Sequence, residues 1–165
     1  MTHLVLGGIA VTLHSGAPVV RYADAGGRTD VRMSDGTPIP MRHWKKRTIL
    51  ISGTGWMATG LDALDWDAYH TLLMPVPLRV SGSGTAMTLT ADARPDEPVT
   101  AQALVGGQWV DTSVAVTGRA ASITPVAGAT SYSVVWFPQY TVLCEPPPED
   151  YAEGIVEWQI IASEV

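Results

Sequence analysis

Glycine and proline interrupt this chain at short intervals, and this punctuation constrains the fold more than any other feature of the sequence. The 16 glycines and 12 prolines are spread along the whole length. The segments between them are short, and many are rich in β-branched and aromatic residues. Such segments, bounded by turn residues, are typical of proteins built from many short strands. The sequence therefore predicts a mostly β protein whose main architecture is a β-sandwich.

The expected strands form two groups, and the borders of these groups predict the domain organisation. The first group occupies residues 4–13, 19–22, 29–33 and 44–52. The second group occupies residues 87–91, 99–105, 108–111, 114–117, 121–124 and 132–137, with a turn about every ten residues, as in a small sandwich. A glycine-rich stretch (81–84) and a proline-rich stretch (145–149) border the second group. We expect a discontinuous domain of residues 1–78 and 139–165 with residues 79–138 inserted into it. The final strand (154–162) would then pair back into the sheet of the first domain.

One segment departs from the strand pattern and predicts a single α-helix flanking the first domain. Thr59 is a suitable N-cap, and Asp62 follows three residues later, where it can accept from the first helical amides. Four apolar residues also lie at helical spacing on one face, namely Leu61, Leu64, Ala68 and Leu72. Acidic residues crowd the N-terminal half, where the helix dipole favours negative charge. The prolines at 75 and 77 would end the helix.

The composition favours a subunit of a larger assembly. Hydrophobic residues make up 46% of the sequence and charged residues 16%, whereas about 25% charged residues is usual. This balance excludes a disordered chain, which would be poor in apolar residues and rich in charge. It also leaves little charge to cover the surface of a free monomer. No run reaches the roughly 18 apolar residues of a membrane span, and residues 4–13 lack the preceding Lys or Arg of a signal peptide.

The net charge of −6 is distributed unevenly. Up to residue 50, seven Lys or Arg residues against three Asp residues give +4, which leaves −10 for the remainder. The densest basic run contains Arg42, Trp44, Lys45, Lys46 and Arg47. We predict that these five residues form a protein interface, either between copies of the chain or with an acidic partner. A solvated hairpin is the alternative. The acidic net charge and the lack of a nucleic-acid-binding motif argue against nucleic acid.

The sequence contains no recognisable catalytic arrangement, so we expect no enzymatic activity, no cofactor and no metal. Neither a nucleophile elbow nor a phosphate-binding loop is present. Asp67 and His70 lie one helical turn apart, but no further metal ligand is indicated, and a solvated helix face explains them better. Cys144 is the only cysteine, so no intrachain disulfide can form, and its apolar surroundings favour a buried structural thiol over a nucleophile. Glu149 and Asp150 are adjacent, unlike the separated carboxylates of a glycosidase.

Two parts of the sequence resemble known families. The run Ala129-Thr130-Ser131-Tyr132-Ser133-Val134-Val135-Trp136 resembles a strand that is common in fibronectin type III modules. Because side chains alternate along a strand, Tyr132, Val134 and Trp136 would share one face. Small tail-tip or minor tail proteins of siphophages are similar in the order of several segments, namely residues 32–36, 44–46, 51–55, 60–66 and 156–165.

The resemblance to tail proteins implies a non-catalytic structural protein of the tail tip or baseplate of a long-tailed phage. It implies a tail-tube-like β-sandwich arranged in a ring, an inserted immunoglobulin- or fibronectin-III-like domain, and contacts with tube or hub proteins. The protein would be part of the virion tail after assembly in the host cytoplasm. The alternative is a carbohydrate- or receptor-binding β-module on the virion surface, with the site in the domain of residues 79–138. A sugar-stacking platform of Trp56, Trp109 and Trp136 is a separate possibility. Trp136, however, is expected in the core, because it alternates with Tyr132 and Val134.

Overall fold

The computed structural model describes residues 2–11, 18–148, 151–152 and 155–165. Strands hold 60% of the residues and helix only 2%, so the prediction of a mostly β protein is confirmed. The chain folds into two compact units. Unit 1 comprises Met1–Leu6 and Thr71–Tyr140, and unit 2 comprises Gly7–His70 and Thr141–Val165. Within the described ranges, no helical segment has the length and apolar character needed to cross a bilayer.

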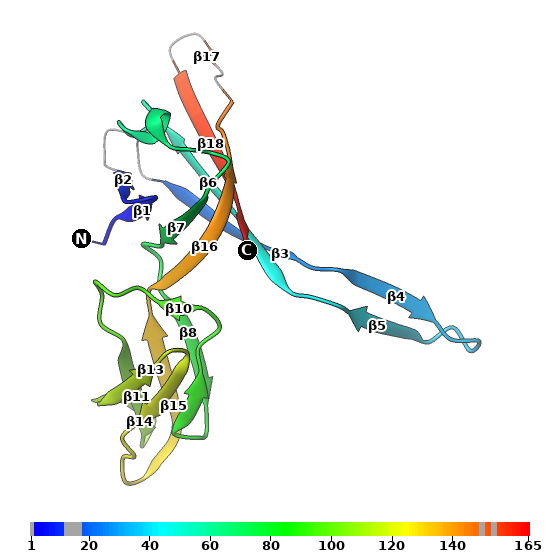
Figure 1. Ribbon diagram of the computed structural model, residues 1–165. Coiled ribbons are helices and arrows are strands. Elements are labelled where there is room, and N and C mark those ends of the chain that lie inside the picture. Colours follow the sequence, from blue (N-terminus) through cyan, green and yellow to red (C-terminus); the bar gives the residue numbers. More distant parts are fainter. Residues whose placement is uncertain (1, 12–17, 149–150, 153–154) are drawn as a thin grey trace. The chain divides into compact units, whose positions relative to one another are not determined.

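Unit 1 contains two antiparallel sheets (Figure 1). The first has the order β12-β11-β15-β8, with β8 at Leu78–Gly82, β11 at Thr100–Val105, β12 at Gln108–Thr112 and β15 at Ala129–Trp136. The second has the order β13-β14-β9, with β9 at Ala86–Thr88, β13 at Val114–Thr117 and β14 at Ala120–Ile123. In addition, β1 (Leu4–Leu6) pairs with β7 (Tyr69–Leu73), and β10 (Asp92–Ala93) pairs with the beginning of β16 (Pro138–Glu145).

The core of unit 1 lies between its two sheets, because strand alternation directs one face of each sheet inward. Tyr132, Val134 and Trp136 of β15 share this core, which confirms the prediction that they lie on one face. The other buried members are Leu89, Ala101, Ala103, Ala121 and Ile123. The Tyr132 hydroxyl accepts a hydrogen bond of 3.1 Å from the backbone N–H of Val126, so the polar end of this buried ring has a partner.

A buried arginine ties separate segments of unit 1 together. The Arg94 side chain is 2% exposed. Its guanidinium donates to the carbonyl oxygens of His3 (3.1 Å) and Met74 (3.0 Å) and forms two bonds of 2.6 Å to the carboxylate of Asp96. The hydrogen bond from Arg94 is the main reason that the pKa of Asp96 lies below its usual value. A buried charge is tolerated only with such partners, so Arg94 fixes where these segments meet.

Unit 2 contains an antiparallel sheet with the order β16-β18-β6-β3. Its strands are β3 (Val19–Ala25), β6 (Lys46–Thr54), β18 (Ile155–Glu164) and the part of β16 that begins at Thr141. Two short strands also belong to unit 2, β2 (Ile9–Val11) and β17 (Tyr151–Ala152), the second of which pairs with β18. β18 pairs with β6 on one side and with β16 on the other, so the prediction that the final strand joins the N-terminal sheet is confirmed.

The buried face of this sheet is made by alternate residues of its strands. β6 contributes Ile49 and Ile51, while β18 contributes Trp158, Ile160 and Ala162. Val142 and Cys144 of β16 are buried as well. The intervening residues of these strands form the outward face of the unit 2 sheet.

The predicted helix over residues 59–72 is wrong. The segment forms one short 3-10 turn, η2 (Leu61–Ala63), and then strand β7. Gly60 precedes the turn with a φ of 101°, which is left-handed and cannot belong to an α-helix. The carboxylates of Asp62 and Asp65 accept from the backbone N–H groups of Gly60 (3.1 Å) and Asp67 (3.2 Å), so they support local turns. The apolar residues at helical spacing are also divided, because Leu61 belongs to unit 2 and Leu72 to unit 1.

Two strand predictions also need correction. The single strand expected over residues 4–13 is two strands, β1 and β2, separated by a Gly7-Gly8 turn. Strand β5 (Pro38–Arg42) was not expected, because its two prolines disfavour a strand in the interior of a sheet.

We predict that Arg94→Met lowers the free energy of unfolding by about 2–4 kcal/mol, because the buried carbonyl group of Met74 and the part-buried one of His3 lose their donor. Arg119→Met is the matched control. Arg119 pairs with Asp92 at 2.7 Å, but both side chains are about half exposed, so the loss should stay below about 1 kcal/mol. Denaturant titration of the two variants measures the difference. Equal losses would contradict the role assigned to Arg94.

The predicted borders of the inserted domain, residues 79–138, remain a prediction that a fragment can test. The core of unit 1 also includes Leu78, so the fragment should span residues 78–140. We expect a β-type circular dichroism spectrum and a cooperative melt, at a lower temperature than in the full chain because Arg94 loses the carbonyl groups of His3 and Met74. A random-coil spectrum would show that this segment does not fold on its own.

Candidate functional site

Part of the predicted interface lies on a two-stranded arm of unit 2. β4 (Arg28–Arg32) and β5 (Pro38–Arg42) pair only with each other among the described strands. We define the arm as residues 26–45. It continues the β3–β6 pair, and no other described strand of unit 2 lies against it (Figure 1). All five residues of β5 are exposed.

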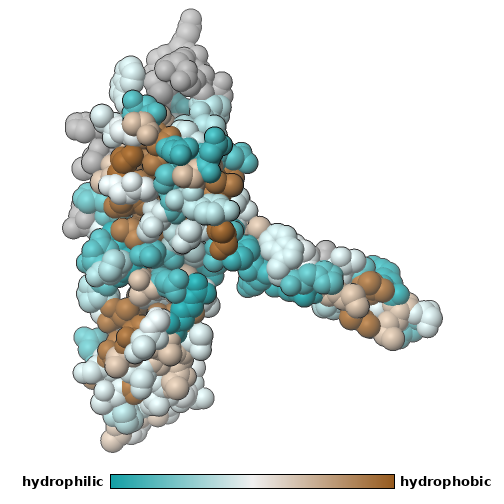
Figure 2. All heavy atoms as spheres, viewed as in Figure 1, coloured by the Kyte–Doolittle hydropathy of each residue, from teal (hydrophilic) through white to brown (hydrophobic). Residues whose placement is uncertain are grey.

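The two faces of the arm differ in chemistry. The register pairs Thr29 with Met41 and Val31 with Ile39, so these side chains share one face. On this apolar face, Val31, Ile39 and Met41 are 40–48% exposed, and Met33 beside them is 54% exposed. Figure 2 shows the apolar spheres gathered on the arm among polar ones. The other face carries Asp30, Arg32, Pro38, Pro40 and Arg42. The arm is therefore an amphipathic ribbon whose apolar face is open to solvent.

A β-bulge connects the arm to the sheet. Ala25 pairs with Lys46, and Arg28 pairs with Arg42, so two residues on one strand lie opposite three on the other. The indole of Trp44 lies over Gly27, where a Cβ atom would come within 2.7 Å of Nε1. Glycine at this position therefore makes room for the indole. Trp44 nevertheless remains 54% exposed.

The structure divides the five predicted interface residues into two sets. Arg42, Trp44 and Lys45 are exposed and line a hollow of about 280 Å³, together with residues 24–26. Lys46 and Arg47 are half-buried and contact their own subunit. The Lys46 ammonium donates to the Val165 carbonyl oxygen (2.7 Å), and the Arg47 backbone N–H donates to Glu164 (2.9 Å). The Arg47 guanidinium also lies 5.6 Å from the ring centre of Tyr22.

The other candidate site residues from the sequence do not form a metal site among the described residues. His70 Nε2 donates to the Asp65 carbonyl oxygen (2.6 Å), and without a helix His70 and Asp67 do not lie one helical turn apart. In the part of the chain that the structure describes, no three His, Cys, Asp or Glu side chains are placed to hold a metal. Glu149 and Asp150 lie outside the described residues.

The three tryptophans considered for sugar stacking do not form one platform. Trp136 is fully buried in the core of unit 1. Trp56 and Trp109 are 73% and 47% exposed, and they belong to different units. Of the three, only these two present a ring to solvent.

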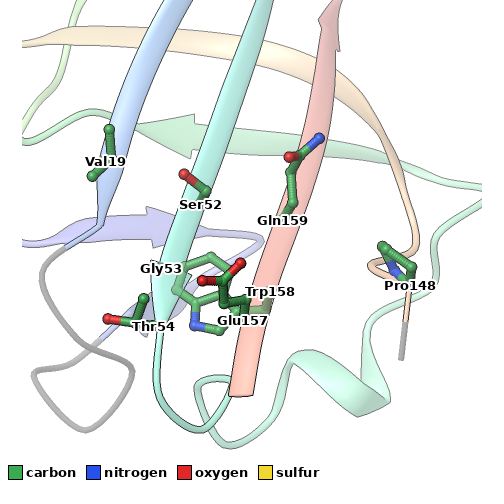
Figure 3. A pocket seen from close by; sticks show the side chains of 8 residues that line it. All are labelled: Val19, Ser52, Gly53, Thr54, Pro148, Glu157, Trp158 and Gln159. Carbon is green, nitrogen blue, oxygen red and sulfur yellow. The ribbon is translucent and has the colours of Figure 1, made fainter. Parts of the chain in front are cut away.

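A second hollow, of about 380 Å³, lies on unit 2 and was not predicted from the sequence. Figure 3 shows its lining, which consists of Val19, Ser52, Gly53, Thr54, Pro148, Glu157, Trp158 and Gln159. These residues come from β3, β6, β18 and the segment before β17, which are far apart in sequence, so no local motif marks them. Among the described residues of the lining, Glu157 is the only charged one.

Comparison with known proteins adds no relative to this description. No family model matches the chain, and no curated protein matches it. The function therefore has to be inferred from the arm, its charges and its exposed apolar side chains.

Cys144 is a buried free cysteine, as predicted. Burial raises the pKa of its thiol from 9.0 to about 11. We expect Ellman's reagent to label Cys144 only after denaturant is added at pH 8, because a pKa shift of two units leaves about 100-fold less thiolate. The raised pKa stabilises the folded state below about pH 9, and this contribution is lost as the pH rises towards 11. Rapid labelling of the folded protein would contradict the burial.

Proposed function

We propose that this protein is a non-catalytic structural subunit that self-associates in the tail tip or baseplate of a long-tailed phage. The observation that supports this most directly is the arm, whose apolar side chains no described part of unit 2 covers. A two-stranded hairpin is only marginally stable in water on its own. Exposed apolar side chains that gather on one face of a soluble protein also often mark an interaction site. A neighbouring subunit would cover the arm and order it.

Placement in a phage tail rests on the resemblance of several segments to siphophage tail proteins and on the uneven charge of the chain. In this proposal unit 2 is a tail-tube-like sandwich that forms a ring and contacts tube or hub proteins. It assembles in the host cytoplasm and remains in the virion tail. Residues 79–138 form a fibronectin-III-like domain. The hydrogen bond from Val126 to the Tyr132 hydroxyl supports this last point, because sandwiches of that class use a tyrosine bonded to backbone a few residues upstream.

A carbohydrate- or receptor-binding module is the second candidate. It is favoured by Trp109, which is 47% exposed on β12, an edge strand of unit 1. An exposed indole offers an apolar ring with a polar N–H, which suits stacking on a sugar.

Light scattering coupled to size exclusion tests the proposal on the full chain of 17.5 kDa. We expect a mass that is a multiple of this value and rises with concentration. Ile39→Ser combined with Met41→Ser should shift the protein towards monomer, because both side chains are exposed in the subunit. The variant should still melt cooperatively, at the melting temperature of the wild type diluted to monomer. Trp109→Ser is the control, since it removes a similarly exposed apolar side chain from unit 1. A monomer at every concentration would contradict the proposal, and loss of sugar binding in Trp109→Ser would favour the second candidate.

A further inference from the structure

Two segments of unit 2 carry opposite net charge. Residues 141–165, which supply β16 and β18 to its sheet, contain six Asp or Glu residues and no Lys or Arg. Of these six, the structure describes Glu145, Glu157 and Glu164. The arm contains four Lys or Arg residues and two Asp residues, a net charge of +2. Unlike charges on one subunit are complementary when a second copy approaches head to tail.

The outward face of β16 and β18 combines apolar side chains with this acidic charge. Leu143 of β16 is 40% exposed. Ile161 of β18 is half-buried and pairs with Glu145 on one side and Leu50 on the other. Glu145 and Glu157 are exposed on the same face, and Glu157 lines the hollow in Figure 3. This face therefore offers an apolar centre with carboxylates around it.

The arm is built to dock by its face and not by the outer edge of β5. The Met33 N–H donates to the Thr37 carbonyl oxygen, and the His43 N–H donates to the Gly27 carbonyl oxygen. These two bonds show which residue pairs of the β4–β5 ladder are hydrogen-bonded. Because hydrogen-bonded and non-bonded pairs alternate, Pro38 and Pro40 fall in non-bonded pairs, with their nitrogens at the outer edge. That edge lacks two donors, so it is a poor template for an added strand.

We propose that the apolar face of the arm packs against the outward face of β16 and β18 in a second copy of this chain. This inference rests on the proposed function and names the surface that receives the arm. Val31, Ile39 and Met41 contact the apolar centre around Leu143 and Ile161. Arg32, Arg42 and Lys45 attract the arm to the carboxylates. They need not lie in the contact, because charges act over a Debye length of about 8 Å and long side chains reach around a thin ribbon. The contact joins unlike surfaces, so it generates a ring or a filament.

A complementary charge exchange tests this contact. The arm variant carries Arg32→Glu, Arg42→Glu and Lys45→Glu. Lys46 and Arg47 are left unchanged, because they contact residues of their own subunit. The sheet variant carries Glu145→Lys and Glu157→Lys. Each variant alone should have a dissociation constant raised at least about tenfold, because like charges then oppose across the contact. A mixture of the two variants should recover association, since each intact or reversed surface meets its complement.

Salt dependence separates the two parts of the contact. The wild type should associate more weakly as salt rises, because its steering charges are screened. The Ile39→Ser and Met41→Ser variant should associate weakly at every salt concentration. The arm charge variant should associate more strongly as salt rises, because salt screens the repulsion between its like charges. A cooperative melt at the melting temperature of the diluted, monomeric wild type confirms that the variants fold. If the wild type assembles and the charge variants assemble equally well, or if the mixture fails to recover, the named surface is wrong while the proposed function stands. A monomeric wild type overturns both.

Discussion

Backbone hydrogen bonding at strand edges is the constraint on which this structure depends. In a protein with almost no helix, every strand that lacks a neighbour exposes unpaired donors and acceptors. Unit 2 meets this requirement with β18, which comes from the end of the chain and bonds to both β6 and β16. The face that β18 buries, with Trp158, Ile160 and Ala162, completes the core that β6 begins. The unit can therefore form only after its two distant segments have met.

The arm leaves one strand edge unpaired, and the way it does so limits how strongly the arm can bind a partner. Prolines remove donors from its outer edge, so its interactions depend on a small apolar face. Full burial of an apolar side chain is worth about 1.5–3 kcal/mol, and four side chains that are already half-buried would contribute roughly 3–6 kcal/mol together. Association costs about 4–15 kcal/mol in lost freedom. One arm therefore gives a weak contact, which suits an assembly where each subunit makes two.

Much of the fold followed from the sequence, because turn residues and strand alternation are local signals. The face shared by Tyr132, Val134 and Trp136 and the pairing of the final strand were both predicted correctly. The helix was not, because Asp62 and Asp65 satisfy the same pattern by bonding to turns. β5 was missed because proline is disfavoured in the interior strands of a sheet but allowed where its nitrogen faces an outer edge, and the sequence does not show which edge faces solvent. The basic run was found, yet its division into exposed Lys45, beside Asp24, and half-buried Lys46 depends on where Val165 lies in the fold.

The bulge at the base of the arm has a geometric consequence for any assembly that uses it. A single extra residue among positions 43–45 bends the ribbon and increases its local twist. In a head-to-tail contact, the direction of the arm fixes the rotation from one subunit to the next. That rotation determines how many copies are needed to close a ring. The indole of Trp44, seated on Gly27, holds this bend. The symmetry of the whole particle would then be encoded by a few backbone torsions in one subunit.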